Sequence, residues 1–151
     1  MTNLALAATA TIFILTAGWE SVVLLYLPAV YIAGAVGVGL FYVQHQFEEA
    51  YWQRGEQWDY ATAAITGSSF LRLPRVLNWF TGNIGFHHVH HLGPKIPNYK
   101  LRQAHEENGI FAAAPVLTLR TAIRTLRLSL YDEERGKLIG FRDLRTRRTA
   151  N

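Results

Sequence analysis

Four of the six histidines in this 151-residue chain lie within the five positions from His87 to His91. His87, His90 and His91 follow the spacing His-x-x-His-His, which places them on one face of a helix. Neutral imidazole nitrogens are ligands for zinc, iron, copper or nickel. The spacing therefore predicts a metal site, with His88 at the edge of the shared face as a structural neighbour. The alternative is a solvated histidine cluster that binds no metal.

His45 is a further candidate ligand because it directly follows a long apolar segment. A histidine at the mouth of a membrane helix can reach a metal held just outside the bilayer. Glu48 lies one turn further on, and we expect it to bond the other ring nitrogen of His45. The spacing equally allows an interfacial histidine that binds no metal. His105 lacks the second histidine of an HExxH motif, so a surface or structural role is expected for it.

The composition limits the other kinds of site. The chain has no cysteine, which excludes disulfides, thiolate metal sites and cysteine nucleophiles. Its formal net charge is +4, but no groove-reading motif accompanies the basic residues, and nucleic acid is not expected as a partner. Basic residues in a chain with an apolar first third are better placed against anionic lipid headgroups.

Charge is distributed unevenly along the sequence. Residues 1–43 contain one acidic residue, Glu20, and no Lys or Arg. Residues 22–43 are uncharged and, at 1.5 Å per residue, reach about 33 Å, enough to cross a bilayer. The alternative is a buried helix of a soluble protein. With the apolar run 3–17, the pattern predicts a membrane helical hairpin over about residues 3–43. The positive-inside rule then places residues 44–151 on the cytoplasmic side.

The region after residue 44 is expected to be helical as well, so the predicted fold class is all-α. Apolar residues recur at helical spacing from residue 116 to 130 beside a stripe of arginines. This pattern predicts a helix that lies on the membrane surface or packs on the protein. Residues 140–151 are expected to form a basic, frayed tail.

Several motifs follow one another in an order that resembles the membrane fatty acid desaturases, closest to the bacterial omega-6 (delta-12) acyl-lipid group. The matching segments are residues 41–48, 51–52, 67–69, 81–85, the histidine box 87–91 and residues 96–99. The resemblance covers about residues 20–110 and implies a non-haem di-iron oxidoreductase of lipid metabolism. Such an enzyme uses O₂ to introduce a cis double bond into a fatty acyl chain, with electrons from ferredoxin or a cytochrome. On this resemblance, His45, His87, His90 and His91 are the expected iron ligands.

One departure from the family pattern is large. The family carries three histidine boxes, and no histidine precedes His45 in this sequence. We therefore expect the chain to be the C-terminal part of a desaturase, with an incomplete di-iron centre and no activity alone. The alternatives are a related membrane hydroxylase or ketolase, and a non-catalytic membrane protein that binds metal through its histidines.

Overall fold

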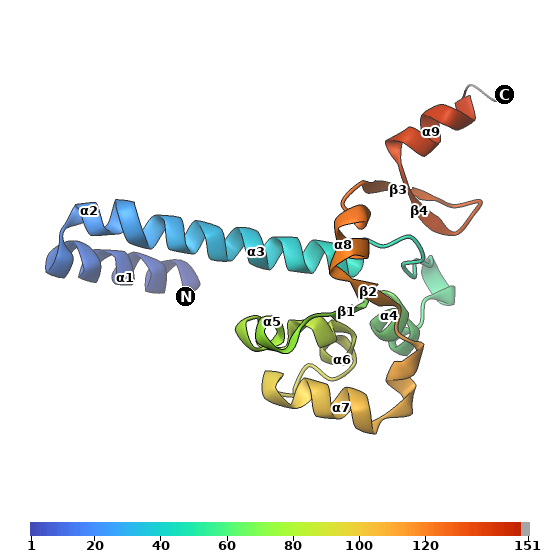
Figure 1. Ribbon diagram of the computed structural model, residues 1–151, viewed down its shortest axis with the longest axis horizontal. Helices are drawn as coiled ribbons and strands as arrows, with labels where there is room; N and C mark the ends of the chain where they lie inside the picture. Colours follow the sequence, from blue (N-terminus) through green and yellow to red (C-terminus); the bar gives the residue numbers. More distant parts are fainter. Residues whose placement is uncertain (149–151) are drawn as a thin grey trace. The chain divides into compact units, whose positions relative to one another are not determined.

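The computed structural model describes residues 1–148 and is predominantly helical (Figure 1). The helices are α1 (Thr2–Ala17), α2 (Trp19–Ser21), α3 (Leu27–His45), α4 (Tyr60–Thr66), α5 (Arg75–Phe80), α6 (His87–Leu92), α7 (Leu101–Glu107), α8 (Leu119–Thr125) and α9 (Phe141–Arg148). The strands are β1 (Phe70–Arg72), β2 (Val116–Thr118), β3 (Leu128–Asp132) and β4 (Lys137–Gly140). The described residues form two compact units, one from Met1 to Leu40 and one that begins at Phe41.

The first unit is a helical hairpin, as the sequence predicts. Gly18 has a positive φ of 82°, a conformation that glycine adopts without steric cost, and it separates α1 from α2. The rings of Phe13 and Tyr26 stack across the hairpin with centroids 5.6 Å apart. A π-helical segment, Val22–Tyr26, joins α2 to α3 immediately before Pro28, whose missing amide N–H relaxes the hydrogen-bond pattern there.

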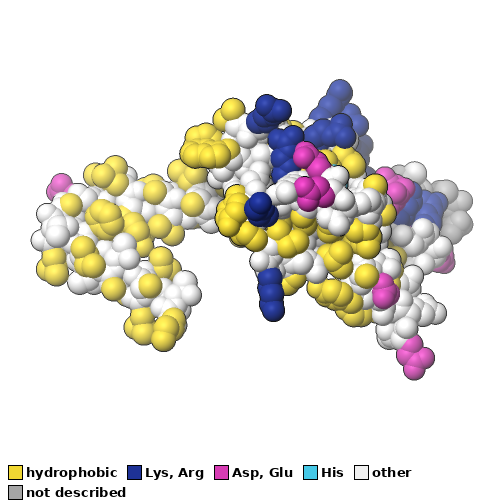
Figure 2. Space-filling model, turned by 90° about the horizontal axis from the view of Figure 1, so that it is seen from below, with side chains coloured by type: hydrophobic (Ala, Val, Ile, Leu, Met, Phe, Trp, Pro, Cys, Tyr) yellow, Lys and Arg dark blue, Asp and Glu magenta, His cyan; other side chains and the backbone are white. Residues whose placement is uncertain are grey.

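The surface of this unit is apolar. Among residues 1–148, one helix is long and apolar enough to cross a membrane by length and composition, Trp19–His45, and only 6% of its apolar window is buried. The 16-residue helix α1 is also apolar but shorter. Figure 2 shows hydrophobic side chains over this unit and no Lys or Arg.

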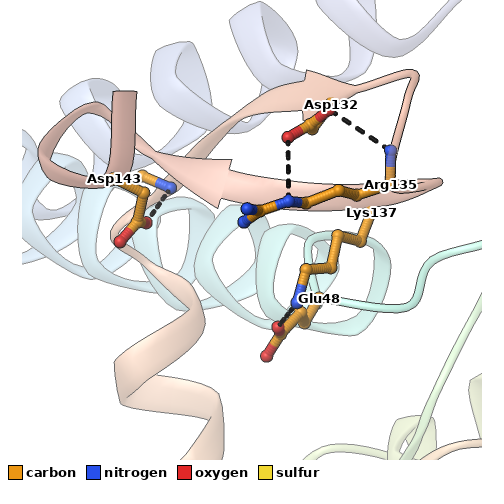
Figure 3. Close-up of polar contacts among 6 residues, drawn as sticks. Glu48, Asp132, Arg135, Lys137 and Asp143 are labelled. Atoms are coloured by element: carbon orange, nitrogen blue, oxygen red, sulfur yellow. Dashed lines mark hydrogen bonds and ion pairs between the residues drawn. The ribbon is translucent and has the colours of Figure 1, made fainter. Parts of the chain in front are cut away.

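The second unit contains two small sheets that the sequence analysis did not predict. β1 pairs with β2 in parallel, and β3 pairs with β4 as an antiparallel hairpin. The β3–β4 hairpin is fixed to the segment after α3 by two contacts. Lys137 Nζ lies 2.6 Å from Glu48 Oε1 (Figure 3), and the Leu138 amide donates to the Glu48 carbonyl. The sheets thus connect segments far apart in the sequence.

The helix predicted over residues 116–130 is wrong in its extent. This stretch forms β2, the seven-residue helix α8 and the start of β3. Thr118 ends the strand and begins the helix through a capping box with Thr121, in which each hydroxyl bonds the other residue's backbone. β2 is held in place by its pairing with β1, in which Phe70 pairs with Val116 and Arg72 with Thr118. A pairing between distant segments leaves no periodic pattern in the local sequence.

The expected frayed tail is also helical through α9. The Gly140 amide donates to Asp143 Oδ2 at 2.9 Å, which satisfies a backbone group at the start of that helix (Figure 3). Residues 149–151, the end of the predicted tail, lie outside the described residues.

A compact apolar core lies under the histidine box. Phe86, Val89, Leu101 and Phe111 are buried together, and Phe70 stacks on Phe86 with centroids 4.8 Å apart. Gly85 enters this region at close range: a Cβ added there would lie 2.5 Å from the Leu71 carbonyl oxygen and 3.0 Å from Asn78 Oδ1. The absence of a side chain at Gly85 therefore allows the segment that leads into the box helix α6 to pack against β1.

Gly85→Ala is expected to destabilise the fold by about 1–3 kcal/mol, because backbone must move to admit the methyl group. Thermal unfolding of the chain in detergent micelles, followed by circular dichroism, measures the change. Gly109→Ala is the matched control, since a Cβ there meets nothing within 4 Å. Equal unfolding temperatures for the two variants would contradict the close approach at Gly85.

Candidate metal centre

Three histidines from two helices converge on one point. His45 ends α3, and His87 and His91 lie one turn apart on α6. The Nε2 atom of His45 lies 3.0 Å from that of His87 and 3.2 Å from that of His91, and the two box nitrogens are 3.1 Å apart. The three Nε2 atoms thus form a nearly equilateral triangle.

The tautomer of His45 follows from its other nitrogen. Nδ1 lies 3.2 Å from the carbonyl oxygen of Gly67, and a carbonyl can only accept. Neutral His45 therefore carries its proton on Nδ1 and directs the lone pair of Nε2 toward His87 and His91. This arrangement, a ring N–H fixed by a backbone carbonyl, is common for metal-binding histidines.

Glu48 does not have the role expected from the sequence. Its carboxylate pairs with Lys137, whereas the Gly67 carbonyl takes the expected position beside His45. The prediction that Glu48 supports His45 is therefore wrong. Glu48 follows the end of α3, so helical spacing from His45 no longer applies to it.

The end of α3 is held by the turn after α4. The Ser69 amide donates to the Gln44 carbonyl at 2.9 Å, next to the contact between His45 and Gly67. A Cβ on Gly67 would lie 2.5 Å from the Ala63 carbonyl oxygen, so the turn depends on glycine there. Residues 67–69 are one of the motifs noted in the sequence, but the sequence gave no sign that a carbonyl there orients a histidine.

The other side of the centre is held by α4. The Tyr60 hydroxyl donates to the His91 carbonyl at 2.7 Å. Nothing in the local sequence links Tyr60 to the box, because the contact depends on the packing of α4 against α6. The carbonyl of His91 belongs to the last turn of α6, which leaves it without a helical partner and available to the hydroxyl.

The centre keeps its imidazoles neutral. Burial, followed by the nearby charges that protonated His91 and His45 would carry, lowers the pKa of His87 to about 3. Burial and the same kind of repulsion also lower the pKa of His91. Both rings are therefore unprotonated at pH 7, which is the state that binds metal.

The geometry fits a metal ion. Nitrogen ligands about 2.0–2.1 Å from one ion, at angles of about 90–110°, lie about 2.8–3.4 Å from one another. The observed separations of 3.0, 3.1 and 3.2 Å fall in this range. Three nitrogen donors on one side of an ion leave its other positions for further ligands. Among residues 1–148, the structure thus supplies one facial set of three imidazoles.

The structure does not bring His90 into this group. Its side chain is exposed, and its ring stacks beside that of His87 with centroids 5.8 Å apart. Neighbouring residues on a helix are about 100° apart around its axis, so His90 and His91 point to different sides of α6. His90 as a ligand therefore stays a prediction.

His88 and His105 form a separate pair behind the box. His88 Nε2 lies 2.9 Å from His105 Nδ1, and His88 is fully buried among the core phenyl rings. Burial, then the neighbouring His105, lowers the pKa of His88 to about 4. The structural roles expected for both residues agree with this contact, although the sequence gave no sign that they meet.

Comparison with known proteins places this histidine centre in a family. The family model described as fatty acid desaturase matches residues 1–121. The chain is 48% identical over 145 residues to a fatty acid desaturase of Bacillus subtilis, an alignment that covers 96% of this chain and 41% of the relative. The chain belongs to the fatty acid desaturase family. It spans about two fifths of the length of that relative.

More distant relatives are plant enzymes. The chain is 39% identical over 69 residues to the temperature-sensitive sn-2 acyl-lipid omega-3 desaturase (ferredoxin), chloroplastic, of Arabidopsis thaliana, covering 44% of this chain and 14% of the relative. It is 39% identical over 66 residues to the endoplasmic reticulum omega-3 fatty acid desaturase of Nicotiana tabacum, with 44% and 16% covered. No solved structure matches the chain significantly.

The purified chain in detergent micelles is expected to bind one divalent ion at the three-histidine group. His91→Ala should weaken Co²⁺ or Zn²⁺ binding by more than about 100-fold, beyond the range typical of groups that only support a ligand. His90→Ala is the matched control on the same short helix and should leave the affinity unchanged. Isothermal titration calorimetry measures both. Equal losses for the two variants would contradict the grouping.

Proposed function

We propose that this chain contributes a metal-binding part of an O₂-dependent non-haem di-iron oxidoreductase that introduces a cis double bond into a fatty acyl chain. The observation that carries the proposal is the triangle of His45, His87 and His91 nitrogens in a member of the fatty acid desaturase family. Iron with O₂ supplies the oxidising power to remove two hydrogens from an unactivated chain, which no side-chain base can do.

His45, His87 and His91 would hold one iron ion. His90, on the same helix but facing a different side, would bind the second ion together with ligands from outside these 151 residues. Di-iron sites take ligands from several helices, and the desaturase pattern that this sequence resembles has three histidine boxes, of which this sequence carries one. The 151 residues therefore supply only part of the ligand set.

The remaining residues of the centre orient and shield it. Gly67 holds the His45 ring through Nδ1–H, and Tyr60 holds the backbone of His91. The Phe41 ring lies 4.6 Å from the His45 ring and 6.3 Å from the His87 ring, centroid to centroid. This phenyl ring gives the centre an apolar neighbour, which suits a hydrocarbon substrate.

Electrons would come from a small carrier such as ferredoxin or a cytochrome. The net charge of +4, with nearly all charged residues after residue 47, provides a basic surface for an acidic carrier. The printed name of the Arabidopsis relative includes ferredoxin, which applies to that protein. The substrate would be a membrane lipid or another fatty acyl compound.

A related membrane hydroxylase or ketolase would use the same ligands. A non-catalytic metal-binding role is favoured by one observation, the single histidine box in this sequence. Metal analysis of the chain produced together with the missing boxes separates these classes. Two iron ions per site support an oxygenase, and product analysis then separates desaturation from hydroxylation.

We further propose a membrane hairpin over about residues 3–43, with residues 44–151 on the cytoplasmic side of a bacterial inner membrane. The support is the absence of Lys and Arg before Arg54. Because the chain has no cysteine, Gln53→Cys and Glu134→Cys provide single labelling sites. An impermeant maleimide should label both only after the cells are opened. Labelling of both in intact cells would overturn the orientation.

The 151-residue chain alone is expected to produce no new unsaturated fatty acid in a host that lacks desaturases. The reason is the incomplete ligand set. Gas chromatography of total lipids measures the product, with the complete family protein from Bacillus subtilis as the positive control. A new double bond from the chain alone would show that these residues suffice for the reaction. In a completed enzyme, His45→Ala and His90→Ala should each lower the iron content by loss of the ion that the residue binds, and each should abolish product formation.

A further inference from the structure

The short helix α5 exposes its apolar side chains and turns a polar side chain toward the protein, the opposite of a helix on a water-facing surface. It lies at the periphery of the unit that begins at Phe41 (Figure 1). Val76, Leu77, Trp79 and Phe80 expose 65%, 41%, 75% and 73% of their surface. The residue of this helix that faces the protein is polar: Asn78 donates through Nδ2 to the Leu73 carbonyl at 3.0 Å.

The apolar side chains cover a wide arc. At about 100° per residue, Val76, Leu77, Trp79 and Phe80 span about 160° of the helix, and Asn78 lies opposite the centre of that arc. The apolar stripe through which a helix packs on a single partner helix is narrower than this arc. A helix that lies in a lipid interface exposes its whole apolar side. The bulky Trp79 and Phe80 rings contact each other at 4.9 Å and prolong this surface.

The charges near α5 have one sign. Residues 60–105 contain no Asp or Glu and five basic residues: Arg72, Arg75, Lys95, Lys100 and Arg102. Arg72 and Arg75 flank the start of α5, are exposed, and form no salt bridge with any residue of the described range 1–148. Long basic side chains beside an apolar helix reach anionic headgroups, and tryptophan prefers the same layer.

We propose that α5 is an interfacial anchor: Val76, Leu77, Trp79 and Phe80 insert into the headgroup layer of an anionic bilayer, with Arg72 and Arg75 on its phosphates. This contact is separate from the apolar hairpin and does not require a bound metal. It has a consequence for the centre, because α5 is joined to the histidine box through Asn78. The Asn83 amide donates to the Asn78 carbonyl at 2.6 Å, and Gly85 lies against Asn78 Oδ1. Insertion of α5 would therefore set the depth of α6 relative to the membrane.

The test uses the whole chain in lipid vesicles with chelator present. A nitroxide is attached to Val76→Cys or, as the matched control, to Glu134→Cys in the exposed turn between β3 and β4. Collision with oxygen, which concentrates in lipid, is compared with collision with a water-soluble nickel chelate. In phosphatidylglycerol vesicles the oxygen-to-nickel ratio is expected to be several-fold higher at residue 76 than at residue 134. Arg72→Gln with Arg75→Gln, or vesicles of phosphatidylcholine, should lower the ratio at residue 76 only.

Three results would overturn the proposal. Equal ratios at residues 76 and 134 would place α5 in water. A label at residue 76 that neither reagent reaches would show that protein, such as a second copy of the chain, covers the face. Equal ratios in anionic and neutral vesicles would remove the part assigned to the arginines. None of these results bears on metal binding by the three histidines, so the proposed function is tested separately.

Discussion

The structure of the centre depends on a constraint on lone pairs. Three Nε2 atoms lie 3.0–3.2 Å apart, and a neutral imidazole carries only one N–H. The His45 proton is committed to the Gly67 carbonyl, so the His45 lone pair must face the other two rings. His87 and His91 cannot satisfy every contact of the triangle by hydrogen bonds among themselves. A single metal ion would accept all three lone pairs at once. The Gly67 hydrogen bond defines the site because it turns the His45 lone pair toward the other two rings.

Much of the surrounding fold serves to keep those three rings together. α6 has six residues, too short to be stable alone, so its position is set by tertiary contacts. Gly85, just before the helix, allows close contact with β1, and Tyr60 holds the last turn of α6. Val89 of α6 itself is completely buried. The Ser69 amide fixes the end of α3 at Gln44, beside His45. Burial of the rings then lowers their pKa values and leaves them ready to bind metal without first losing protons.

The sequence predicted those parts of the fold that depend on local periodicity. Uncharged runs predicted the hairpin. The His-x-x-His-His spacing predicted that His87, His90 and His91 share one face, and the structure brings His87 and His91 together but not His90. His45 was predicted as a ligand from its place after the apolar segment, and the structure brings it to the other two histidines. The parallel pairing of β1 with β2 joins three-residue strands more than 40 positions apart, and such strands are too short to show a period. The same limit explains the overextended helix at 116–130. The replacement of Glu48 by the Gly67 carbonyl was not predictable, because every residue type carries a backbone carbonyl.

X-ray absorption spectroscopy of the chain loaded with one Zn²⁺ or Fe²⁺ per molecule tests the central claim most directly. The multiple-scattering signal of imidazole reports how many histidines bind the ion. The structure predicts three imidazole nitrogens at about 2.0–2.1 Å, and one fewer in His45→Ala. A spectrum with oxygen ligands and at most one imidazole, unchanged in His45→Ala, would contradict the account.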